Sequence, residues 1–507
     1  MKTSLFSKPL GFDTIRWLQS LVALLMIVGV FSVVWELVAL HSHRSSFLAA
    51  FDELGPDVSS DDLLHLSYLQ TACHAETNTV LPWSFAAPGN AADQTYPSAH
   101  FSTSVFHKSD PRLLEQLRQC PDVDIYMPSS ARGPAGCAAV AGPLKFLRSR
   151  LLPRWALDFK MYDIATKART SYFKLCPKTP VLFMAPEHVL EVTELPSWPS
   201  NKPVYLMVPG LELETTSSPP PDYTSSVLER TDVVLCRTRR CHRDMEQYLQ
   251  SHSSKTRVLY TSQVSADPSN FARRILGDRA LYERNLTNFA VTRFAHTTWN
   301  ITSKTTQDVM DCWSTHVTEL PPLDVYLLKG DHEKEPSDGA RLYKSFPDKN
   351  NATVKTLDAL KFARTFANSS FFICPTANDD CLDLARASGG VIVTADGYPM
   401  NELISGPSEG LLFPTDQSAE SEKLVPDDML LLPPAPASYR SSDLCNAVLK
   451  AGESTSVNDR MSMGTQARHH FNEDAKLFML RMLELSALAR ASQDPALELQ
   501  QNLRHLP

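Results

Sequence analysis

Short apolar runs alternate with amphipathic stretches over most of the chain beyond residue 111. The apolar runs are rich in β-branched and aromatic residues and lie at 123–127, 181–184, 204–208, 233–236, 258–260, 289–294, 323–328, 371–373 and 391–394. The stretches between them have helical periodicity, as at 145–152, 305–313, 356–367 and 380–388. Strands that alternate with helices in this way predict parallel sheets built from βαβ units.

The runs form two series, which predict two doubly wound α/β domains at 112–287 and 288–450. A charged, helical-looking connector at 267–288 separates the two series. A further periodic stretch from residue 458 to about 499 predicts a long helix, and we treat 451–507 as a C-terminal helical tail. In open sheets of this kind, ligands bind beyond the carboxyl ends of the strands. The polar loops that follow the strands are therefore expected to form any site.

An apolar segment at 18–40 precedes both domains. It contains few polar residues, among them Gln19 and Glu36, and about 20 residues are enough to span a bilayer. Basic residues precede it and tryptophans lie near both ends, which favours a single-pass type II anchor with 1–17 cytoplasmic. The rest of the chain then lies in the lumen of the ER or Golgi, with 41–111 as a stalk. The alternative is a cleaved secretory signal peptide, whose apolar core is shorter.

Cysteines and glycosylation sequons agree with an oxidising compartment. All ten cysteines lie beyond residue 40, and an even number permits disulfides, although the sequence leaves their pairing open. Cys236 and Cys374 each end an apolar run, and we interpret these two as simply buried. No Cys/His spacing typical of a zinc site is present, and we expect no metal. Sequons for N-linked glycosylation occur at Asn285, Asn300, Asn351 and Asn368.

The overall charge argues against one class of partner. The 507 residues carry a formal net charge of −8, and no basic stripe with interleaved aromatic residues is present, so no nucleic acid is expected to bind. Glycine is scarce, with 18 residues where an average usage of about 7% would give roughly twice as many. Few glycines are therefore available for loops in which the backbone must approach a ligand closely.

One block carries the most specific pattern: SFFICPTANDDCLDLARASGGVIVTADGYPMNEL, residues 370–403. It contains a strand followed by Pro375, a helix that ends in ARASG, a second strand that ends at Thr394, and the loop PMNEL. GLLFP follows at 410–414. In this order the elements resemble the C-terminal signature of GT-B glycosyltransferases of the family 4, or group 1, type. The segments around Lys304 and over 463–478 are similar to further parts of that family, so the resemblance covers about 123–478.

The resemblance implies a fold and an activity. The fold is the α/β GT-B architecture, with two facing Rossmann-like domains, of which 112–287 binds the acceptor and 288–450 binds the nucleotide-sugar donor. The tail at 451–507 crosses back to the first domain. The first domain further resembles a membrane-anchored eukaryotic branch. Such enzymes transfer a sugar to a glycan, lipid or protein with retention of configuration, and need no obligatory metal and no cofactor beyond the donor substrate.

Eight residues are expected to bind the donor because they match the family's loops or lie at the same edge. They are His296, Lys304, Pro375, Asp379, Asp380, Thr394, Asn401 and Glu402. Lys304 is expected to pair with the diphosphate, because a buried phosphate needs cations or N–H donors. The alternative is a solvated lysine at a helix start. Glu402 is expected to accept from ribose or sugar hydroxyls, or else to complement the dipole of its own helix.

Glu187 and His188 are the candidates for acid/base catalysis. They follow the strand at 181–184, on the side of the first domain that should face the cleft. A single histidine is also commonly structural, and the sequence leaves both interpretations open. Asp122-Val123-Asp124 has the DxD spacing of another glycosyltransferase fold, but it begins a predicted strand, and we assign it no role.

Departures from the family pattern leave two functions open. Leu384 stands where the second of the family's paired glutamates is expected, and the glycines of the family's EGFG segment are missing. A glycan at Asn300 would crowd the cleft. The first hypothesis is an active glycosyltransferase of the secretory pathway. The alternative is a catalytically inactive, glycosyltransferase-like luminal binding or scaffold protein. A secreted binding protein without such an ancestor would leave the order of the motifs unexplained.

Overall fold

The computed structural model describes much of the chain beyond residue 57. The described residues are 58–86, 105–208, 222–267, 289–298, 301–321, 323–327, 352–356, 369–376, 381–416, 430–431 and 438–493. All of them belong to one compact unit, Val58–Pro507. No helix within these ranges is long and apolar enough to cross a membrane. The predicted anchor at 18–40 and the four sequon asparagines lie outside the described residues.

The first sheet has seven strands in the described part of the chain, in the order β1-β3-β2-β6-β7-β8-β9. The strands are β1 (Leu81–Pro82), β2 (Asp124–Tyr126), β3 (Arg150–Leu152), β6 (Val181–Phe183), β7 (Val204–Met207), β8 (Val233–Cys236) and β9 (Arg257–Tyr260). Every neighbouring pair is parallel except β1 with β3. The chain adds β3 on one side of β2 and β6 to β9 on the other, so the order reverses between β2 and β6.

The second sheet has six strands in the order β12-β11-β10-β13-β14-β15, all parallel. The strands are β10 (Phe294–Thr298), β11 (Leu323–Leu327), β12 (Ala352–Thr356), β13 (Phe371–Ile373), β14 (Val391–Asp396) and β15 (Gly410–Pro414). Counted along the chain this is the order 3-2-1-4-5-6 of dinucleotide-binding Rossmann folds, and it reverses between β10 and β13. A separate hairpin pairs β4 (Met161–Asp163) with β5 (Ala168–Thr170).

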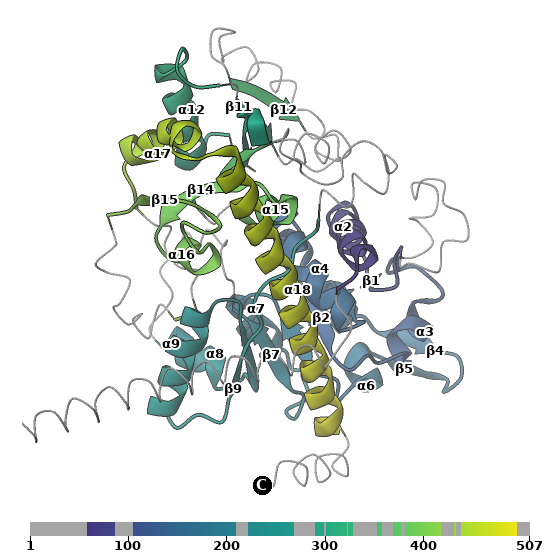
Figure 1. Ribbon diagram of the computed structural model, residues 1–507. Coiled ribbons are helices and arrows are strands. Elements are labelled where there is room, and N and C mark those ends of the chain that lie inside the picture. Colours follow the sequence, from purple (N-terminus) through teal and green to yellow (C-terminus); the bar gives the residue numbers. More distant parts are fainter. Residues whose placement is uncertain are drawn as a thin grey trace, which may run out of the picture. The chain divides into compact units, whose positions relative to one another are not determined.

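Helices cover both faces of each sheet (Figure 1). In the first half they are α2 (Ser60–Ala75), α3 (Leu113–Arg118), α4 (Pro134–Phe146), α5 (Arg154–Asp158), α6 (Tyr172–Leu175), α7 (Pro186–Thr193), α8 (Tyr223–Leu228) and α9 (Arg239–Ser251). In the second half they are α12 (Lys304–Thr315), α15 (Cys381–Ser388), α16 (Met400–Leu403), α17 (Ser441–Ser454) and α18 (Val457–Gln493).

Alternate strand residues enter different hydrophobic clusters, as two-sided burial requires. Ile125 of β2 packs with residues of α2, α4 and α18, whereas Tyr126 packs with residues of α5 to α9. In the second sheet, Phe371 packs with residues of α12 and α17, and Phe372 with residues of α15. Strands buried on both faces are apolar throughout, which explains the continuous runs in the sequence. The predicted α/β class with two Rossmann-like, doubly wound sheets is confirmed.

Two strands differ from the sequence-based expectation. The stretch 145–152 is predicted as helix, but its last three residues form β3, where the Arg150 side chain pairs with Asp124 inside the sheet at 2.8 Å. The strand predicted at 289–294 instead begins at Phe294 and contains the sequence FAHTT. Apolar periodicity does not identify either strand, because a buried ion pair stabilises one and buried polar side chains fill the other.

The segment predicted as a stalk also contributes to the first half. Within it, α2 packs against α4, and Cys73 of α2 forms a disulfide with Cys137 of α4. A capping box joins the side chains of Ser59 and Asp62 to backbone N–H groups at the start of α2. At least residues 58–86 are therefore part of the folded unit.

All ten cysteines form disulfides. The pairs are Cys73–Cys137, Cys120–Cys176, Cys236–Cys241, Cys312–Cys445 and Cys374–Cys381. Cys236 and Cys374 are buried at strand ends as predicted, but the interpretation that they are simply buried is wrong. Each bonds to a cysteine in the first turn of the helix that follows its strand, so these two disulfides close short strand-to-helix connections.

The long C-terminal helix α18 packs against both halves (Figure 1). It contacts α15 and β14 in the second half and α4 in the first. Glycine permits its closest approach. Gly389 has φ of +68°, and a Cβ added at Gly464 of α18 would overlap the Gly389 carbonyl oxygen. Any larger residue at 464 would push α18 away from the end of α15.

Candidate donor site and the contact between the two halves

The strand order of the second sheet defines where a ligand is expected. At the reversal between β10 and β13, the connections after the two strands run to opposite faces of the sheet, which leaves a crevice at the carboxyl edge in folds of this kind. β10 ends at Thr298, and α12 begins at Lys304 with Ser303 as its cap. β13 is followed by Cys374, Pro375 and Thr376, which match the predicted motif.

His296 lies at this reversal, but both of its ring nitrogens are engaged. Nδ1 donates to the Ile373 carbonyl oxygen at 2.7 Å, and Nε2 lies 3.1 Å from the Thr306 hydroxyl. The carbonyl can only accept, so Nδ1 carries the proton and Nε2 accepts from Thr306. Burial lowers the pKa of His296 to about 4, which keeps the ring neutral. His296 therefore joins β10, β13 and α12 and offers no free nitrogen to a donor.

Lys304 occupies the first position of α12 and pairs within that helix. Its Nζ lies 2.6 Å from the Asp308 carboxylate and 5.6 Å from the centre of the Tyr439 ring. Asp308 also accepts a hydrogen bond of 2.8 Å from Ser441 of α17. The Lys304 side chain remains 78% exposed. An incoming anion can therefore reach its ammonium group, but has to share it with Asp308.

The residues after β13 and at the end of β14 have different environments. Thr394 donates its hydroxyl to the Cys374 carbonyl at 2.6 Å, which ties β14 to the loop after β13 and leaves the hydroxyl committed to the protein. Pro375 is buried in that loop, beside Thr376. Thr376 is only 6% exposed, and its hydroxyl has no hydrogen-bond partner among the residues that the structure describes. Asp379 and Asp380, expected at the start of the next helix, lie outside the described residues.

Glu402 contacts the first half of the molecule. Its carboxylate accepts hydrogen bonds from the backbone N–H groups of Arg239 and Arg240, the first two residues of α9. Tyr398 of the same loop shares a 2.6 Å hydrogen bond with Thr238, the N-cap of α9, and its ring lies 4.9 Å from the Arg240 guanidinium carbon. The loop after β14 thus caps a helix of the other half, a contact that the sequence did not indicate.

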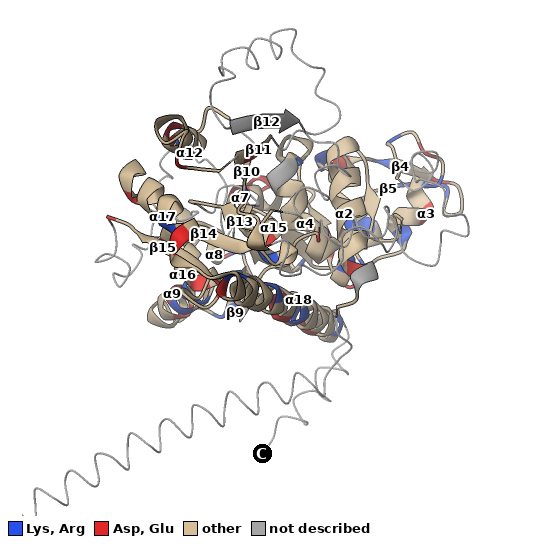
Figure 2. Ribbon diagram, turned by 45° about the horizontal axis from the view of Figure 1, so that its top comes forward, with Lys and Arg blue, Asp and Glu red and all other residues tan. Residues whose placement is uncertain are grey.

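The electrostatics at Glu402 combine two opposing effects. Burial raises the pKa of the Glu402 carboxyl, and the N–H donors and arginines of α9 lower it by less, so that the net shift is upward. Asn401 next to it is exposed and donates to the Asp396 carboxylate at 3.5 Å. Of this pair, only Glu402 is placed to act between the two halves. Figure 2 shows the ribbons of α9 and α16 next to each other, with an acidic position of α16 in red.

A second polar contact joins the halves through α15 and α18. Gln263, after β9, donates to the Asp383 carboxylate at 2.8 Å. Arg386 of α15 forms ion pairs with Asp383 at 3.6 Å and with Asp474 of α18. Ser262 donates to Asp474 at 2.6 Å. Burial raises the pKa of Asp383. The only signal for this contact in the sequence is the i,i+3 spacing of Asp383 and Arg386.

Leu384, at the position of the family's second glutamate, is a packing residue. It is partly buried against the cluster formed by α15, α16 and the second sheet. No acidic side chain replaces it there, because the neighbouring Asp383 is directed toward Gln263 and Arg386. Of the acidic residues of this region that the structure describes, Asp383 and Glu402 each accept a hydrogen bond from the first half.

Glu187 and His188 lie in the first turn of α7, directly after β6. The His188 ring stands edge-on to Tyr126 of β2, with centroids 5.8 Å apart, and its buried Nδ1 has no hydrogen-bond partner. Burial lowers the pKa of His188, so the ring is neutral at neutral pH. Glu187 is exposed. Among the described residues, no hydrogen bond or ion pair connects either of them to the donor-site residues of the second half.

The described residues contain no group of three or more His, Cys, Asp or Glu that could hold a metal ion. The DxD sequence illustrates why its spacing alone is weak evidence. Asp124 is the first residue of β2 and is fully buried, where its carboxylate accepts from Arg150 at 2.8 Å and from the Tyr172 hydroxyl at 2.7 Å. Both oxygens are thereby used inside the sheet.

No protein-family profile matches this sequence, and no curated protein is similar to it in sequence. Solved structures with a similar fold include Anabaena HepE in complex with UDP-glucose, with 10% identity, a TM-score of 0.44, and coverage of 73% of this chain and 99% of that one. Another is S. aureus TarM in a complex containing UDP, with 12% identity, a TM-score of 0.43, and coverage of 64% and 61%.

A third similar structure is a glycosyltransferase from Rickettsia africae, with 11% identity, a TM-score of 0.40, and coverage of 61% of this chain and 76% of that one. A glycosyltransferase is also what the sequence resemblance predicts. The strand order and pairing of this chain define its α/β fold with two doubly wound sheets.

Proposed function

We propose that the protein is a glycosyltransferase that takes its sugar from a nucleotide-sugar bound at the carboxyl edge of the second sheet. The observation that supports this most is the reversal of strand order between β10 and β13, where ligands of open α/β sheets bind. At that point Thr376 has a buried hydroxyl without a partner in the described part of the chain, next to the matched Pro375. A buried hydroxyl without a hydrogen bond costs free energy, and a donor molecule would satisfy it.

The proposed roles follow from the groups that remain available. Lys304 and the N-terminal end of α12 would neutralise the donor diphosphate, since cations and helix N-termini both favour phosphate. His188, neutral and with one free nitrogen, would serve the acceptor side of the reaction together with Glu187. His296, Thr394 and Glu402 would position loops rather than touch the donor. Retention of configuration and a metal-independent reaction remain expectations from the family resemblance.

The proposed location is the lumen of the ER or Golgi, reached through the apolar segment at 18–40 as a single-pass type II anchor. The disulfides support this location, because ten paired cysteines are typical of an oxidising compartment and rare in the cytosol. The acceptor would be a glycan, lipid or protein of the secretory pathway.

A second candidate is a catalytically inactive scaffold with the same fold. Two observations favour it: Leu384 replaces the expected second glutamate, and the Glu402 carboxylate already caps α9. In that case the contact between the halves would have replaced the donor contact.

Transfer and donor cleavage distinguish the two candidates. The full chain, purified in detergent, would be incubated with UDP-, GDP- and ADP-linked sugars, and release of nucleotide would be followed by chromatography. The transferase should release nucleotide from one donor class, and Thr376→Val should slow this release while the protein stays folded by circular dichroism. No release from any donor by a folded protein, with or without added glycan and lipid acceptors, would favour the scaffold.

A further inference from the structure

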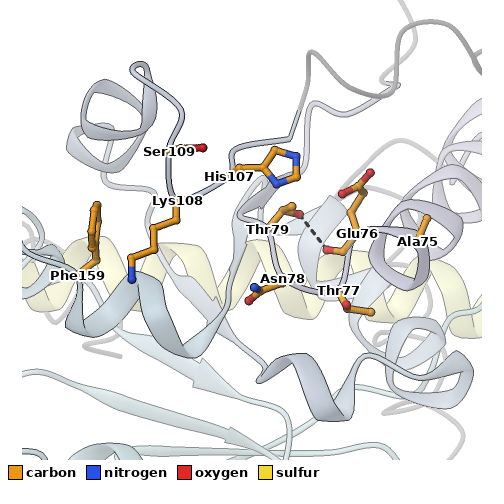
Figure 3. A pocket seen from close by; sticks show the side chains of 9 residues that line it. All are labelled: Ala75, Glu76, Thr77, Asn78, Thr79, His107, Lys108, Ser109 and Phe159. Carbon is orange, nitrogen blue, oxygen red and sulfur yellow. Dashed lines mark hydrogen bonds between the residues drawn. The ribbon is translucent and has the colours of Figure 1, made fainter.

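The first half of the molecule contains a surface cavity of about 540 Å³, which none of the residues expected to bind the donor lines. It is lined by Ala75, Glu76, Thr77, Asn78, Thr79, His107, Lys108, Ser109 and Phe159 (Figure 3). None of these belongs to the second sheet or its helices. Small-molecule sites commonly have volumes of about 300–1,000 Å³, so a mono- or disaccharide is of suitable size.

The cavity lies at the carboxyl edge of the first sheet. One wall is the turn between α2 and β1, and Phe159 directly follows α5, the helix that begins at the end of β3. Asn78 of the turn is fixed to this edge from two sides. Trp155 of α5 donates to its carbonyl at 3.0 Å, and Ser129, after β2, donates to its side-chain oxygen at 3.2 Å. Glu187 and His188 follow the neighbouring strand β6 and lie at the same edge.

The lining is typical of a site for a hydroxyl-rich ligand. Figure 3 shows Lys108 beside the Phe159 ring, and its Nζ lies 4.9 Å from the ring centre. The side chains of Thr77, Ser109 and the amide nitrogen of Asn78 have no hydrogen-bond partner among the described residues, so they can bind sugar hydroxyls. An aromatic face with a few polar groups around it fits the pattern of small-molecule sites.

A buried, unpaired cation stands directly behind the cavity wall. Arg132 is 1% exposed, and its Nη1 donates to the carbonyl oxygens of Glu76 at 3.3 Å and of Thr79 at 2.8 Å, two residues that line the cavity. Its Nε and Nη2 have no partner, and no carboxylate of the described residues pairs with it. Burial lowers the pKa of Arg132 to about 9, and the attraction of Tyr126 opposes this shift only in part.

The position of Arg132 adds to the positive potential. It immediately precedes Gly133, the N-cap of the 13-residue helix α4, so the positive end of that helix dipole lies at the same place. Among the residues that line the cavity, Lys108 carries a positive charge, Glu76 a negative one, and His107 can titrate, while Arg132 lies behind the wall. A buried cation without a counter-ion is costly, and an anion in the cavity would reduce that cost.

We propose that this cavity binds an acidic sugar unit of the acceptor, with its ring on the Phe159 side and its anionic group attracted by Lys108 and Arg132. This inference rests on the proposed transferase function only in assigning the ligand to the acceptor substrate. The site itself lies wholly in the first half. The anionic group is either a carboxylate, as in a uronic acid, or a phosphate on a sugar. Both provide the same hydrogen-bond acceptors for a guanidinium or ammonium group.

The test measures binding of three methyl glycosides to the full chain in detergent by saturation-transfer NMR and calorimetry, without any nucleotide-sugar. The ligands are methyl glucoside, methyl glucuronide and methyl glucoside 6-phosphate. At least one acidic ligand should bind about tenfold or more tightly than the neutral one, the effect of one charge-assisted hydrogen bond. The tighter of the two acidic ligands identifies the source of the charge.

Lys108→Gln is the main variant, because Lys108 is exposed and its loss should leave the fold intact. It should remove most of the preference for the acidic ligand, whereas the matched control Lys178→Gln, another exposed lysine of the first half, should leave it unchanged. Arg132→Gln is secondary, since Arg132 also satisfies two backbone carbonyls. Equal binding of all three ligands, no binding of any, or an equal loss in Lys178→Gln would overturn the proposal. Acidic-sugar binding by a chain that binds no nucleotide-sugar would keep this site and reject the transferase.

Discussion

The most informative single substitution is Glu402→Ala, because it separates two roles for one carboxylate. In the structure Glu402 caps α9 of the other half by accepting from the backbone N–H groups of Arg239 and Arg240. A donor-binding glutamate would instead accept from ribose or sugar hydroxyls. Truncation to alanine removes both acceptor oxygens and leaves the N-cap Thr238 in place, where it still accepts from the Cys241 N–H at 3.2 Å.

The expected loss follows from the contacts. Replacing a helix-capping side chain by alanine costs about 0.5–2 kcal/mol. Burial raises the pKa of Glu402, so the folded state binds more protons than the unfolded state just above pH 4.5. Its contribution to stability is therefore full below that pH and falls as the pH rises through the folded-state pKa. At neutral pH the ionised carboxylate has lost part of its solvation, which offsets part of what the cap contributes. We therefore expect Glu402→Ala to lower the free energy of unfolding by about 1 kcal/mol.

Hydrogen exchange measured by mass spectrometry detects this loss of stability at the level of single peptides. A change of about 1 kcal/mol corresponds to roughly fivefold faster exchange, expected in the peptide that covers α9 and in the peptide that covers the loop after β14. Peptides of β2 and β6, far from the contact in the sheet order, should exchange as before. Glu453→Ala is the matched control, because Glu453 is exposed on α17 and forms no side-chain ion pair or hydrogen bond with the described residues.

The result that would refute this assignment is specific. If α9 exchanges at the same rate in Glu402→Ala while affinity for a nucleotide-sugar falls, Glu402 contacts the donor and its hydrogen bonds to α9 do not stabilise that helix. If α9 exchanges faster and donor affinity is unchanged, the carboxylate serves the contact between the halves alone.

Three further predictions concern the buried interactions that support the site. Asp124→Asn should destabilise the first half by about 3–5 kcal/mol, because it leaves the buried Arg150 guanidinium without its counter-ion; thermal unfolding followed by circular dichroism measures the loss. The pKa of His296 is lowered from 6.5 to about 4, so the folded protein binds fewer protons at this site than the unfolded protein. The free energy of unfolding should therefore fall as the pH drops from 6.5 toward 4, by up to ~1.4 kcal/mol per pH unit. Denaturant titrations across that pH range check the sign. Cys445→Ser should cost about 2–5 kcal/mol by opening the 133-residue separation to Cys312, which equilibrium urea unfolding detects.

Most of the fold could be predicted from the sequence because parallel strands buried on both faces are apolar without interruption. The runs at 181–184, 204–208 and 233–236 became β6, β7 and β8 with nearly the predicted bounds. The same criterion failed for β3 and β10, whose buried Arg150 and His296 read as polar in the sequence. These side chains enter the interior because Asp124 and the Ile373 carbonyl compensate for them. Such partners are remote in sequence and become visible only in three dimensions.

The site was less predictable for the same reason. The sequence placed Glu402 in the first turn of a helix, and the structure agrees, but the N–H groups that donate to its carboxylate belong to a helix that begins 163 residues earlier. The disulfide partners of Cys236 and Cys374 lie five and seven residues away, yet apolar context alone favoured simple burial. Arg132, the buried cation behind the cavity, follows an ordinary loop in sequence and gave no signal, because burial of a charge depends on what packs over it.

The measurement that tests the central claim most directly is calorimetric binding of UDP-, GDP- and ADP-linked sugars to the full chain in detergent. A donor site at the start of α12 predicts selective binding of one nucleotide class, weakened at least about tenfold in Lys304→Ala through loss of a charge-assisted contact with the diphosphate. The exposed lysine variant Lys450→Ala should bind as the unmodified chain does. Absence of binding for every donor by a folded protein, or an equal loss in both lysine variants, would contradict a donor site at the start of α12.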